Sequence, residues 1–272
     1  MPAVYQLPIV SNIEVRGGAY LLTLEAPEIA HSCAPGNFIQ IKINFPGNGL
    51  WRRPFSILDT DRNNIRVLYK TLGRGTAALA EFKAGGVLNI IGPLGNCFSN
   101  PDNDTTVLLI GGGIGIPPLY YLTKRLTESG FPRQSIHFFN GASDYDSLTY
   151  LEETSELGIN VYAVTEDGSM GIKGVVTDGA RQFLSGVDNS IDPPKKRIFA
   201  CGPAQMLKAV SKLAAQFNVK GEIAMEALMP CGFGICMGCV IKVADPCSSC
   251  HYSFKRVCQD GPIFNASDII WD

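Results

Sequence analysis

The sequence lacks any concentration of charge. It carries 23 Lys and Arg against 25 Asp and Glu, so its net charge is −2, and the basic residues are spread along the chain. Nucleic-acid binding needs concentrated positive charge, so we expect no nucleic-acid partner. No G-x-S-x-G, H-E-x-x-H or P-loop motif occurs either, and hydrolysis therefore has no candidate machinery.

A long uninterrupted hydrophobic run is also missing. The most apolar stretch, residues 106–122 (TVLLIGGGIGIPPLYYL), contains four glycines and two prolines and is a poor membrane span. The start of the chain, MPAVYQLPIV, lacks the basic residues, apolar run and cleavage site of a secretory signal. We expect a cytoplasmic protein without a membrane segment, where structural disulfides are rare.

Cysteine, by contrast, is abundant. Nine cysteines occur in 272 residues, and six of them lie between residues 231 and 272. In a reducing compartment this number requires a metal or redox explanation. Three histidines accompany them (His31, His137 and His251), and we expect these to be structural.

The length and the 46% hydrophobic content predict more than one domain with a substantial core. Within residues 1–99, the segments 38–43 (FIQIKI) and 65–70 (IRVLYK) alternate apolar and polar side chains with a period of two. This pattern, with Gly and Pro between the segments, predicts antiparallel strands in a β-barrel or sandwich.

Residues 100–220 have a different pattern. Short apolar runs typical of strands buried on both faces occur at residues 106–110, 135–140, 159–164 and 197–202. The segment 203–217 is helical in pattern, with one apolar stripe formed by Met206, Val210, Leu213 and Phe217. Strands alternating with helices predict an α/β domain with a doubly wound parallel sheet. The remaining residues, 221–272, are loop-rich, so their cysteines must organise them.

Two turns of the second domain carry glycines after a strand. The first holds Gly111, Gly112, Gly113 and Gly115; the second holds Cys201, Gly202 and Pro203. Bare backbone before a helix N-terminus can approach a pyrophosphate, and ligands of open parallel sheets bind beyond the C-terminal strand ends. Both turns therefore indicate one nucleotide cleft, although Ile116 stands where G-x-G-x-x-G has its last glycine. The alternatives are a tight strand-to-helix turn and, for Cys201, simple burial.

The first domain offers two elements for an anionic, ring-containing ligand. In residues 51–57 (WRRPFSI), arginine can fork onto a phosphate, Phe55 can stack on a ring and Ser56 can hydrogen-bond. Residues 73–76 (GRGT) precede an expected helix at 77–82, which is a further possible anion site. Flavin binding competes here with a solvated arginine pair and an ordinary N-cap at Thr76.

The cysteine spacing Cys231-x4-Cys236-x2-Cys239 with one distant cysteine is associated with plant-type 2Fe–2S ligation. Cys247, Cys250 and Cys258 are the candidates for the fourth ligand. Zinc is the rival interpretation, because Cys236-x2-Cys239 and Cys247-x2-Cys250 form two C-x2-C pairs. Their separation of seven residues, however, is tighter than the usual zinc-ribbon loop.

Across its whole length the chain resembles the electron-transfer subunits of dihydroorotate dehydrogenase B, within the ferredoxin-NADP reductase superfamily. The motifs that carry the resemblance are RRPFSI, GRGT, GPLGN, GGGIGIPPL, CGPAQML, EALMPCGFGICMGCV and KRVCQDGPIF. The resemblance implies an FAD-binding β-barrel (1–99), an NAD-binding α/β domain (100–220) and a 2Fe–2S segment (221–272). It implies FAD contacts from Arg53, Pro54, Phe55, Ser56, Tyr69, Lys70, Gly73, Gly75 and Thr76. It implies NAD(H) contacts at the two glycine turns and cluster ligation by Cys231, Cys236, Cys239 and Cys258.

One departure and one related family qualify the resemblance. The CSSC sequence at 247–250 inserts two extra thiols between the third and fourth ligands. A related family, the small subunits of bifurcating NADH-dependent ferredoxin:NADP oxidoreductases, has an aspartate where Cys231 stands. Cys231 and RRPFSI favour the dihydroorotate branch. A third alternative, from another class, is a zinc-stapled nucleotide-binding regulatory subunit.

The resemblance further implies that electrons pass between NAD(H), FAD, the cluster and the FMN of a catalytic partner, in a heterotetramer. That partner oxidises dihydroorotate to orotate, a step in pyrimidine biosynthesis, and the physiological flow runs toward NAD. The present chain has no candidate base for dihydroorotate, so we expect an electron conduit. We expect NAD rather than NADP, because Asp144 and Asp146 after the strand at 135–140 would repel a 2′-phosphate.

Overall fold

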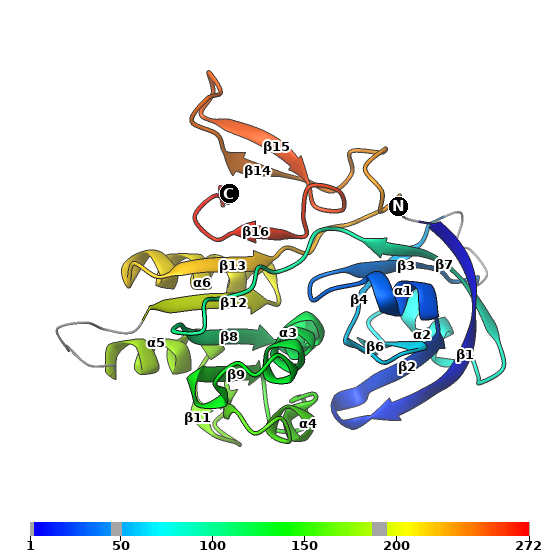
Figure 1. Ribbon diagram of the computed structural model, residues 1–272, viewed down its shortest axis with the longest axis horizontal. Coiled ribbons are helices and arrows are strands. Elements are labelled where there is room, and N and C mark those ends of the chain that lie inside the picture. Colours follow the sequence, from blue (N-terminus) through cyan, green and yellow to red (C-terminus); the bar gives the residue numbers. More distant parts are fainter. Residues whose placement is uncertain (1–2, 45–50, 187–194, 272) are drawn as a thin grey trace.

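The computed structural model describes residues 3–44, 51–186 and 195–271. Figure 1 shows three parts: an antiparallel sheet built by the first strands, a sheet flanked by helices, and a C-terminal segment along one side of both. Within the described ranges, no helix has both the length and the apolar character that crossing a membrane requires.

The first sheet contains seven strands in the order β4-β3-β7-β1-β2-β6-β5, and every pairing is antiparallel. The strands are β1 (Ala3–Val15), β2 (Ala19–Glu25), β3 (Phe38–Lys42), β4 (Arg53–Ser56), β5 (Asp59–Thr60), β6 (Asn64–Lys70) and β7 (Val87–Leu94). The period-two pattern works as expected, because Ile39, Ile41, Ile65 and Val67 are fully buried in one core. Two short helices, α1 (Pro27–Ser32) and α2 (Arg74–Ala80), belong to this part.

The prediction of a closed β-barrel is wrong. In the described part of the chain, no ladder joins the edge strands β4 and β5, so the sheet is open. Both edges are poor partners: β5 has two residues, and Pro54 in β4 has no backbone N–H to donate. The chain after β4 is joined to β6 by a backbone hydrogen bond outside the ladders, from the Leu58 N–H to the Arg66 C=O at 2.8 Å.

The second sheet has the order β11-β10-β9-β8-β12-β13-β16. Its parallel strands are β8 (Thr106–Gly112), β9 (Ile136–Ala142), β10 (Asn160–Thr165), β11 (Ile172–Lys173), β12 (Lys196–Cys201) and β13 (Lys220–Ala224). The last strand, β16 (Ile263–Asn265), is antiparallel to β13. Because β9 and β12 lie on opposite sides of β8, the strand order reverses between β8 and β12, where ligands of such sheets bind.

Helices cover both faces of this sheet, as doubly wound folds require. They are α3 (Ile116–Glu128), α4 (Leu151–Ser155), α5 (Val176–Gly186) and α6 (Ala204–Gln216). Strand β8 shows how the faces divide: Leu108 and Ile110 pack with α5 and α6, whereas Val107 and Leu109 pack with α3. The predicted buried strands and α/β class of this part are therefore confirmed.

The two sheets are held together by a buried carboxylate. Asp59, 1% exposed, accepts hydrogen bonds from Lys124 of α3 at 2.8 Å and also pairs with Arg66. Nearby, the Tyr121 hydroxyl of α3 donates to Cys33 C=O at 3.2 Å. These contacts fix how the first sheet faces the carboxyl ends of the parallel strands.

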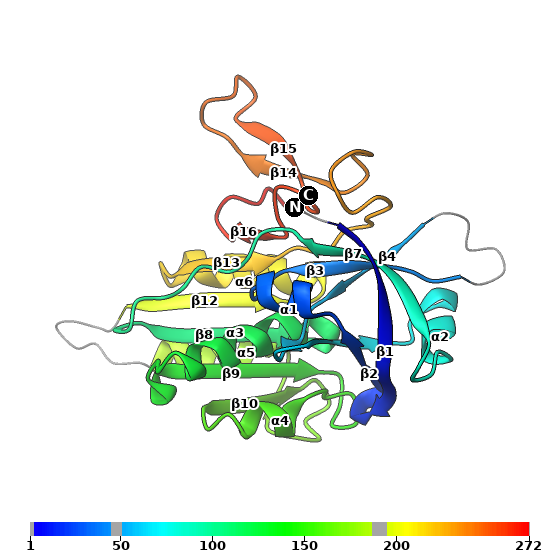
Figure 2. The same ribbon diagram turned by 45° about the vertical axis from the view of Figure 1, so that its right-hand side comes forward.

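The C-terminal segment leaves β13, forms a hairpin and returns. The hairpin consists of β14 (Val240–Ala244) and β15 (Tyr252–Arg256) and projects away from both sheets (Figures 1 and 2). The chain then comes back as β16 to pair with β13, so the segment is anchored at both ends on the second sheet. We call residues 225–239 the cluster loop and residues 245–251 the hairpin tip.

Candidate functional site

The first glycine turn joins β8 to α3, and its glycines are needed for different reasons. A Cβ on Gly115 would collide with the Cys201 carbonyl at the end of β12, and one on Gly112 would collide with the Met206 sulfur. Gly113 has φ +57 and nothing within 4 Å of a Cβ position, so it faces open space in a left-handed conformation. The turn is thus packed tightly against β12 on one side and open on the other.

The second turn lies directly beside the first. Cys201 pairs with Gly111 in the sheet register, Gly202 has φ +158, and Pro203 precedes α6. Together the turns border a cavity of about 420 Å³, whose lining includes Gly112, Gly113, Ser143, Glu166, Pro203 and Met206. The structure therefore brings both predicted glycine turns to one cleft, at the point where the strand order reverses.

The Cys201 side chain belongs to a second cavity, of about 230 Å³, between the two sheets. This cavity is lined by Phe55 and Ser56 of β4, Pro118 of α3, Cys201 of β12, and Met225 and Glu226 of the cluster loop. Burial, reinforced by the negative charge of Glu226, raises the pKa of the Cys201 thiol, which therefore stays neutral. Although much of Glu226 is exposed, desolvation of its carboxyl at the cavity raises its pKa as well.

The RRPFS segment contributes four predicted residues in strand β4. Phe55 is buried and packs edge-on against Tyr69, with ring centroids 5.7 Å apart. Arg53, Pro54 and Ser56 are half-buried, and Arg53 donates to Arg52 C=O at 3.1 Å. Pro54 lines both the cavity between the sheets and an adjoining cavity of about 370 Å³. This strand therefore forms a wall of both cavities, which we together call the hollow.

The other predicted residues of the first domain lie at the end of β6 and at the start of α2. Tyr69 stands behind Phe55; its hydroxyl donates to Asn12 Oδ1 at 3.0 Å, and burial raises its pKa to about 12. The Lys70 ammonium reaches the second domain, where it donates to Ser147 C=O at 3.2 Å. At the start of α2, Gly75 is buried, and the Thr76 hydroxyl accepts the Gly73 N–H at 3.2 Å.

The cysteines of the cluster loop and Cys258 form two sulfur pairs: Cys231 with Cys236, and Cys239 with Cys258. Cys239 and Cys258, each 2% exposed, have sulfurs 3.3 Å apart. Backbone N–H groups point at the sulfurs: Gly234 donates to Cys258 at 3.2 Å, and Gly238 donates to Cys236 at 3.4 Å. Within the described ranges, no three Cys, His, Asp or Glu side chains converge on one point as a single metal ion would need.

The thiol pKa values reveal the electrostatics of the loop. Burial acts to raise the pKa of Cys231, but hydrogen bonds from Cys236, Phe233 and Ile235 outweigh it and lower the pKa to about 6. Burial and then the neighbouring Cys239 thiol raise the pKa of Cys258 to about 12. Two thiolates in contact repel each other, so this pair ionises fully only beside a cation.

The two extra cysteines are in different surroundings. Cys247 and Cys250 are exposed at the hairpin tip, where Asp245 Oδ1 accepts the Cys247 N–H at 3.1 Å. Neither side chain is among the causes that shift the pKa values of Cys231 and Cys258. The structure thus separates the six C-terminal cysteines into a group of four and a pair.

Sequence reasoning missed several residues of the hollow. Pro118 follows the first glycine turn, and Met225, Glu226 and Met229 come from the cluster loop. Gln40 of β3, fully buried, donates from Nε2 to Met229 C=O at 3.1 Å. Gln40 lies at the centre of the alternating run FIQIKI, on the face opposite Ile39 and Ile41. This position could have indicated a contact outside the core of the first sheet.

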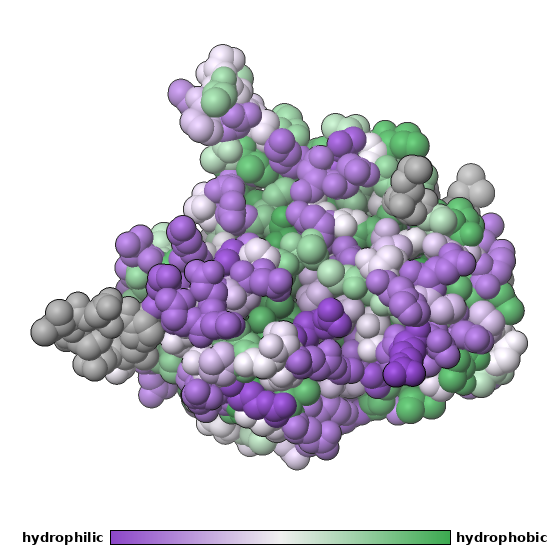
Figure 3. Space-filling view, in the orientation of Figure 1, coloured by the Kyte–Doolittle hydropathy of each residue, from purple (hydrophilic) through white to green (hydrophobic). Residues whose placement is uncertain are grey.

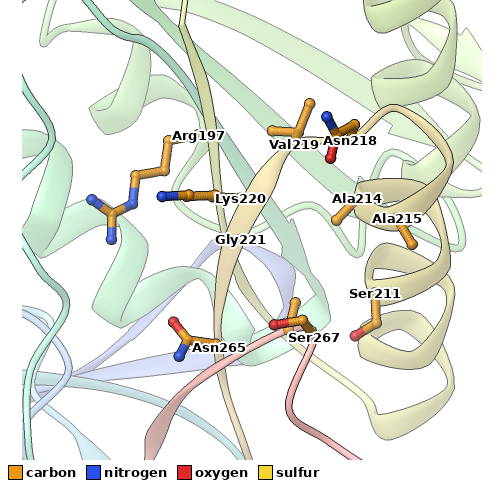
Figure 4. Close-up of a pocket in the computed structure, with 11 residues that line it drawn as sticks. Arg197, Ser211, Ala214, Ala215, Asn218, Val219, Lys220, Gly221, Asn265 and Ser267 are labelled. Atoms are coloured by element: carbon orange, nitrogen blue, oxygen red, sulfur yellow. The ribbon is translucent and has the colours of Figure 1, made fainter.

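A larger cavity, of about 440 Å³, lies near the amino ends of strands β12 and β13. It is bordered by Arg197 and Lys220, near the starts of these two strands, and by residues of α6. Figure 4 shows both cationic side chains directed away from Ser211 of α6. Arg197 is paired with Glu222 at 2.6 Å. This cavity is remote from the glycine turns, which follow the carboxyl ends of the strands.

Comparison with known proteins assigns the fold to a class. The oxidoreductase NAD-binding domain family matches residues 109–212. The solved structure of an NADH-dependent reduced ferredoxin-NADP oxidoreductase, studied for flavin-based electron bifurcation, is 30% identical with a TM-score of 0.82, covering 98% of this chain and 90% of that one. The FAD- and heme-bound flavohemoglobin from Malassezia yamatoensis shares the fold, at 17% identity and a TM-score of 0.63, covering 79% and 57%. The chain therefore has the fold of ferredoxin-NADP reductase-like oxidoreductases.

Further comparisons narrow this class to one family. Residues 226–270 match the iron-sulfur cluster binding domain of dihydroorotate dehydrogenase B. The electron transfer subunit of dihydroorotate dehydrogenase B (NAD(+)) from Bacillus mycoides (strain KBAB4) is 37% identical over 96% of both chains. The corresponding subunit of Bacillus cereus (strain G9842) is 36% identical over the same shares. The chain belongs to the family of dihydroorotate dehydrogenase B (NAD(+)) electron transfer subunits, which confirms the resemblance found in the sequence.

Proposed function

We propose that this chain carries electrons between NAD(H) and the FMN of a dihydroorotate dehydrogenase catalytic subunit, by way of FAD and a 2Fe–2S cluster. The observation that carries the proposal is the cavity between the sheets, since β4, Cys201 of the second glycine turn and the cluster loop all line it. One hollow thus lies beside the three groups of residues expected to hold the three cofactors. Within the family, this arrangement suits a chain that conducts electrons and leaves pyrimidine chemistry to its partner.

The residues around the hollow fit a flavin. FAD, when bound, exchanges a hydride with NAD(H) and single electrons with an iron-sulfur cluster. Arg53 lines the adjoining cavity, where it could meet a phosphate. Ser56 offers a hydroxyl to the cavity between the sheets, and Phe55 and Pro54 supply an apolar wall there. On the opposite wall, the neutral Cys201 thiol and Pro118 leave room for the nicotinamide side. The Gly73–Thr76 turn is the proposed second contact for FAD.

The four thiols Cys231, Cys236, Cys239 and Cys258 are the proposed cluster ligands. The sulfurs of Cys239 and Cys258, 3.3 Å apart, are close enough to bind one iron atom of a two-iron cluster together. N–H groups directed at sulfur stabilise thiolates and tune the cluster potential. This arrangement favours Cys258 over Cys247 and Cys250 as the fourth ligand.

NAD(H) is the proposed nucleotide at the two glycine turns. Asp144 follows β9 and is fixed by hydrogen bonds from Ser143 Oγ at 2.7 Å and Ser147 N–H at 2.8 Å. These bonds lower the Asp144 pKa, so its carboxylate stays charged at neutral pH. A negative charge here disfavours the 2′-phosphate of NADPH. Comparing NADH and NADPH as reductants of bound FAD tests this preference.

The partner would dock over the cluster loop and the hairpin. Large apolar side chains are exposed there: Leu228, Phe233, Ile235, Met237, Val240 and Phe254. In Figure 3 hydrophobic surface appears at the top of the molecule, near this loop. Contiguous exposed apolar groups are typical of protein interfaces.

We propose that the chain forms a heterotetramer with an FMN-containing catalytic subunit. We place this assembly in the cytoplasm, because nine cysteines without a disulfide are compatible with reducing conditions.

The test is anaerobic rapid mixing of NADH with the FAD-loaded protein, in wild type, Cys231→Ser and the matched control Cys247→Ser. In Cys231→Ser, we expect flavin reduction to persist and electron delivery to the catalytic subunit to stop. Cys247→Ser should match wild type in both steps. Unchanged delivery by Cys231→Ser would contradict the proposal.

A second candidate is the small subunit of a bifurcating NADH-dependent ferredoxin:NADP oxidoreductase, which the 30% identical structure favours. The two functions differ in their terminal partners. Dihydroorotate-dependent NADH formation with a catalytic subunit supports the first, whereas coupling of NADH oxidation to NADPH and ferredoxin supports the second.

A further inference from the structure

The strand β3 carries one polar residue at its centre that contacts the C-terminal segment. Ile39 and Ile41 on either side of Gln40 point into the core of the first sheet, so Gln40 points to the opposite face. On that face Phe38, two residues earlier, packs in one cluster with Met229, Cys239 and Cys258. Figures 1 and 2 show the chain between β13 and β14 running beside β3 and β7.

Gln40 contacts the cluster loop on both sides of Cys231. Its Nε2 donates to Met229 C=O at 3.1 Å, two residues before the cysteine. Gly232, the residue after it, lies so close that an added Cβ would be 2.5 Å from Gln40 Cγ and Nε2. In the sheet, Gln40 pairs with Pro54 of the proposed flavin strand. Gln40 therefore links two elements. Its backbone pairs with the proposed flavin strand β4, and its side chain contacts the cluster loop.

The environment of the Gln40 amide is unusual. The residue is 0% exposed, and its Oε1 is buried without a hydrogen-bond partner within the described residues. Buried amide oxygens are nearly always paired, so this position is unfavourable for an amide. An apolar side chain of the same length would avoid that cost, but it would leave Met229 C=O without its donor.

We propose that Gln40 is a positioning residue for electron transfer between flavin and cluster: it holds the turn around Cys231 at a fixed distance from β4. This inference rests on the proposed function, since it concerns the path between those two cofactors. It assigns Gln40 no contact with either cofactor. Because neither Gln40 nor Met229 lines the cavity at the two glycine turns, the tether should not affect hydride transfer from NADH.

The test compares the cofactor-loaded wild type with Gln40→Met, which keeps length and removes the amide. Hydrogen exchange of residues 228–236 should accelerate about 5- to 10-fold, the effect of one net hydrogen bond. Rapid mixing should show unchanged flavin reduction by NADH and slower reduction of the cluster. Asn160→Leu is the matched control: it removes amide-to-carbonyl bonds to Gln134 and Ile136 in the second domain, and neither readout should change.

A second pair of variants keeps the inference testable if Gln40→Met folds poorly. Gly232→Ala would press its Cβ onto the Gln40 side chain, so its effect on loop exchange should be smaller in a Gln40→Ala background. Unchanged loop exchange in Gln40→Met, additive effects in the pair, or equal slowing of flavin and cluster reduction would each overturn the proposal. Absence of iron from the wild type would instead overturn the proposed function, while the exchange experiment would still report on the tether.

Discussion

The cluster loop and the hairpin tip both carry a C-x2-C pair, yet the fold treats them differently. Cys239 of the first pair is buried, and its sulfur contacts that of Cys258, which receives a backbone N–H. Cys247 and Cys250 of the second pair are exposed on a projecting turn. The comparison teaches that spacing identifies thiols able to bind metal, whereas sulfur contacts and N–H donors, which even the exposed Cys236 has, decide which of them are arranged to do so.

The largest expected effect comes from removing a buried thiol of the group of four. Cys258→Ser should lower cluster retention by more than the roughly 10–100-fold typical of changes outside the ligand shell, because a ligand itself is lost. Cys250→Ser, at the hairpin tip, should retain wild-type iron. Iron and sulfide assays on both purified variants provide the measurement, and a reversed result would mean that the pair, not Cys258, completes the ligand set.

A smaller effect is expected from the backbone of the loop. Gly234 has φ +88 and donates its N–H to Cys258 Sγ, so Gly234→Ala forces a left-handed alanine at a cost of roughly 1–2 kcal/mol. Iron release to a chelator should accelerate accordingly. Ser249→Ala in the hairpin tip is the control and should release iron at the wild-type rate. Equal rates in all three proteins would show that the loop conformation does not support the cluster.

The smallest effect concerns the brace beneath the loop. Arg256 donates to Gly234 C=O at 3.0 Å and is itself held by Asp260, whose pKa the Arg256 hydrogen bonds lower. Because this pair is partly exposed, Asp260→Asn should reduce the free energy of unfolding by about 0.5–1 kcal/mol at neutral pH. Asp245→Asn, which alters a carboxylate at the hairpin tip, is the control and should leave the free energy of unfolding unchanged.

The pH dependence of this effect has a definite sign. A depressed folded-state pKa stabilises the fold above the unfolded value of about 3.9, and the stabilisation is lost as pH falls through the folded value. The difference between wild type and Asp260→Asn should therefore shrink below about pH 4. Urea titrations at several pH values measure it, and a difference that grows on acidification would contradict the assignment.

Much of the fold could be predicted from the sequence because local patterns decide it. The alternation in β3 and β6 and the apolar runs of β8 and β9 require only neighbouring residues. Closure of the first sheet depends on its two edges, and the short β5 and proline-bearing β4 leave it open. Pattern reasoning could not anticipate this, because closure is a property of the whole sheet.

The candidate site was predictable in part for the same reason. Both glycine turns follow strands whose order places them together, whereas the return of three-residue β16 to β13 depends on distant pairing. The spacing left Cys247, Cys250 and Cys258 equivalent, and only the resemblance selected Cys258. Gln40 was hidden because its partner, Met229, is 189 residues away.

Chemical analysis of the anaerobically purified protein, together with its absorption spectrum, tests the central claim most directly. The account predicts bound flavin, with iron and acid-labile sulfide in equal amounts and full retention of both in a Cys247→Ser, Cys250→Ser double variant. Zinc in place of iron, or a colourless protein without sulfide, would contradict it.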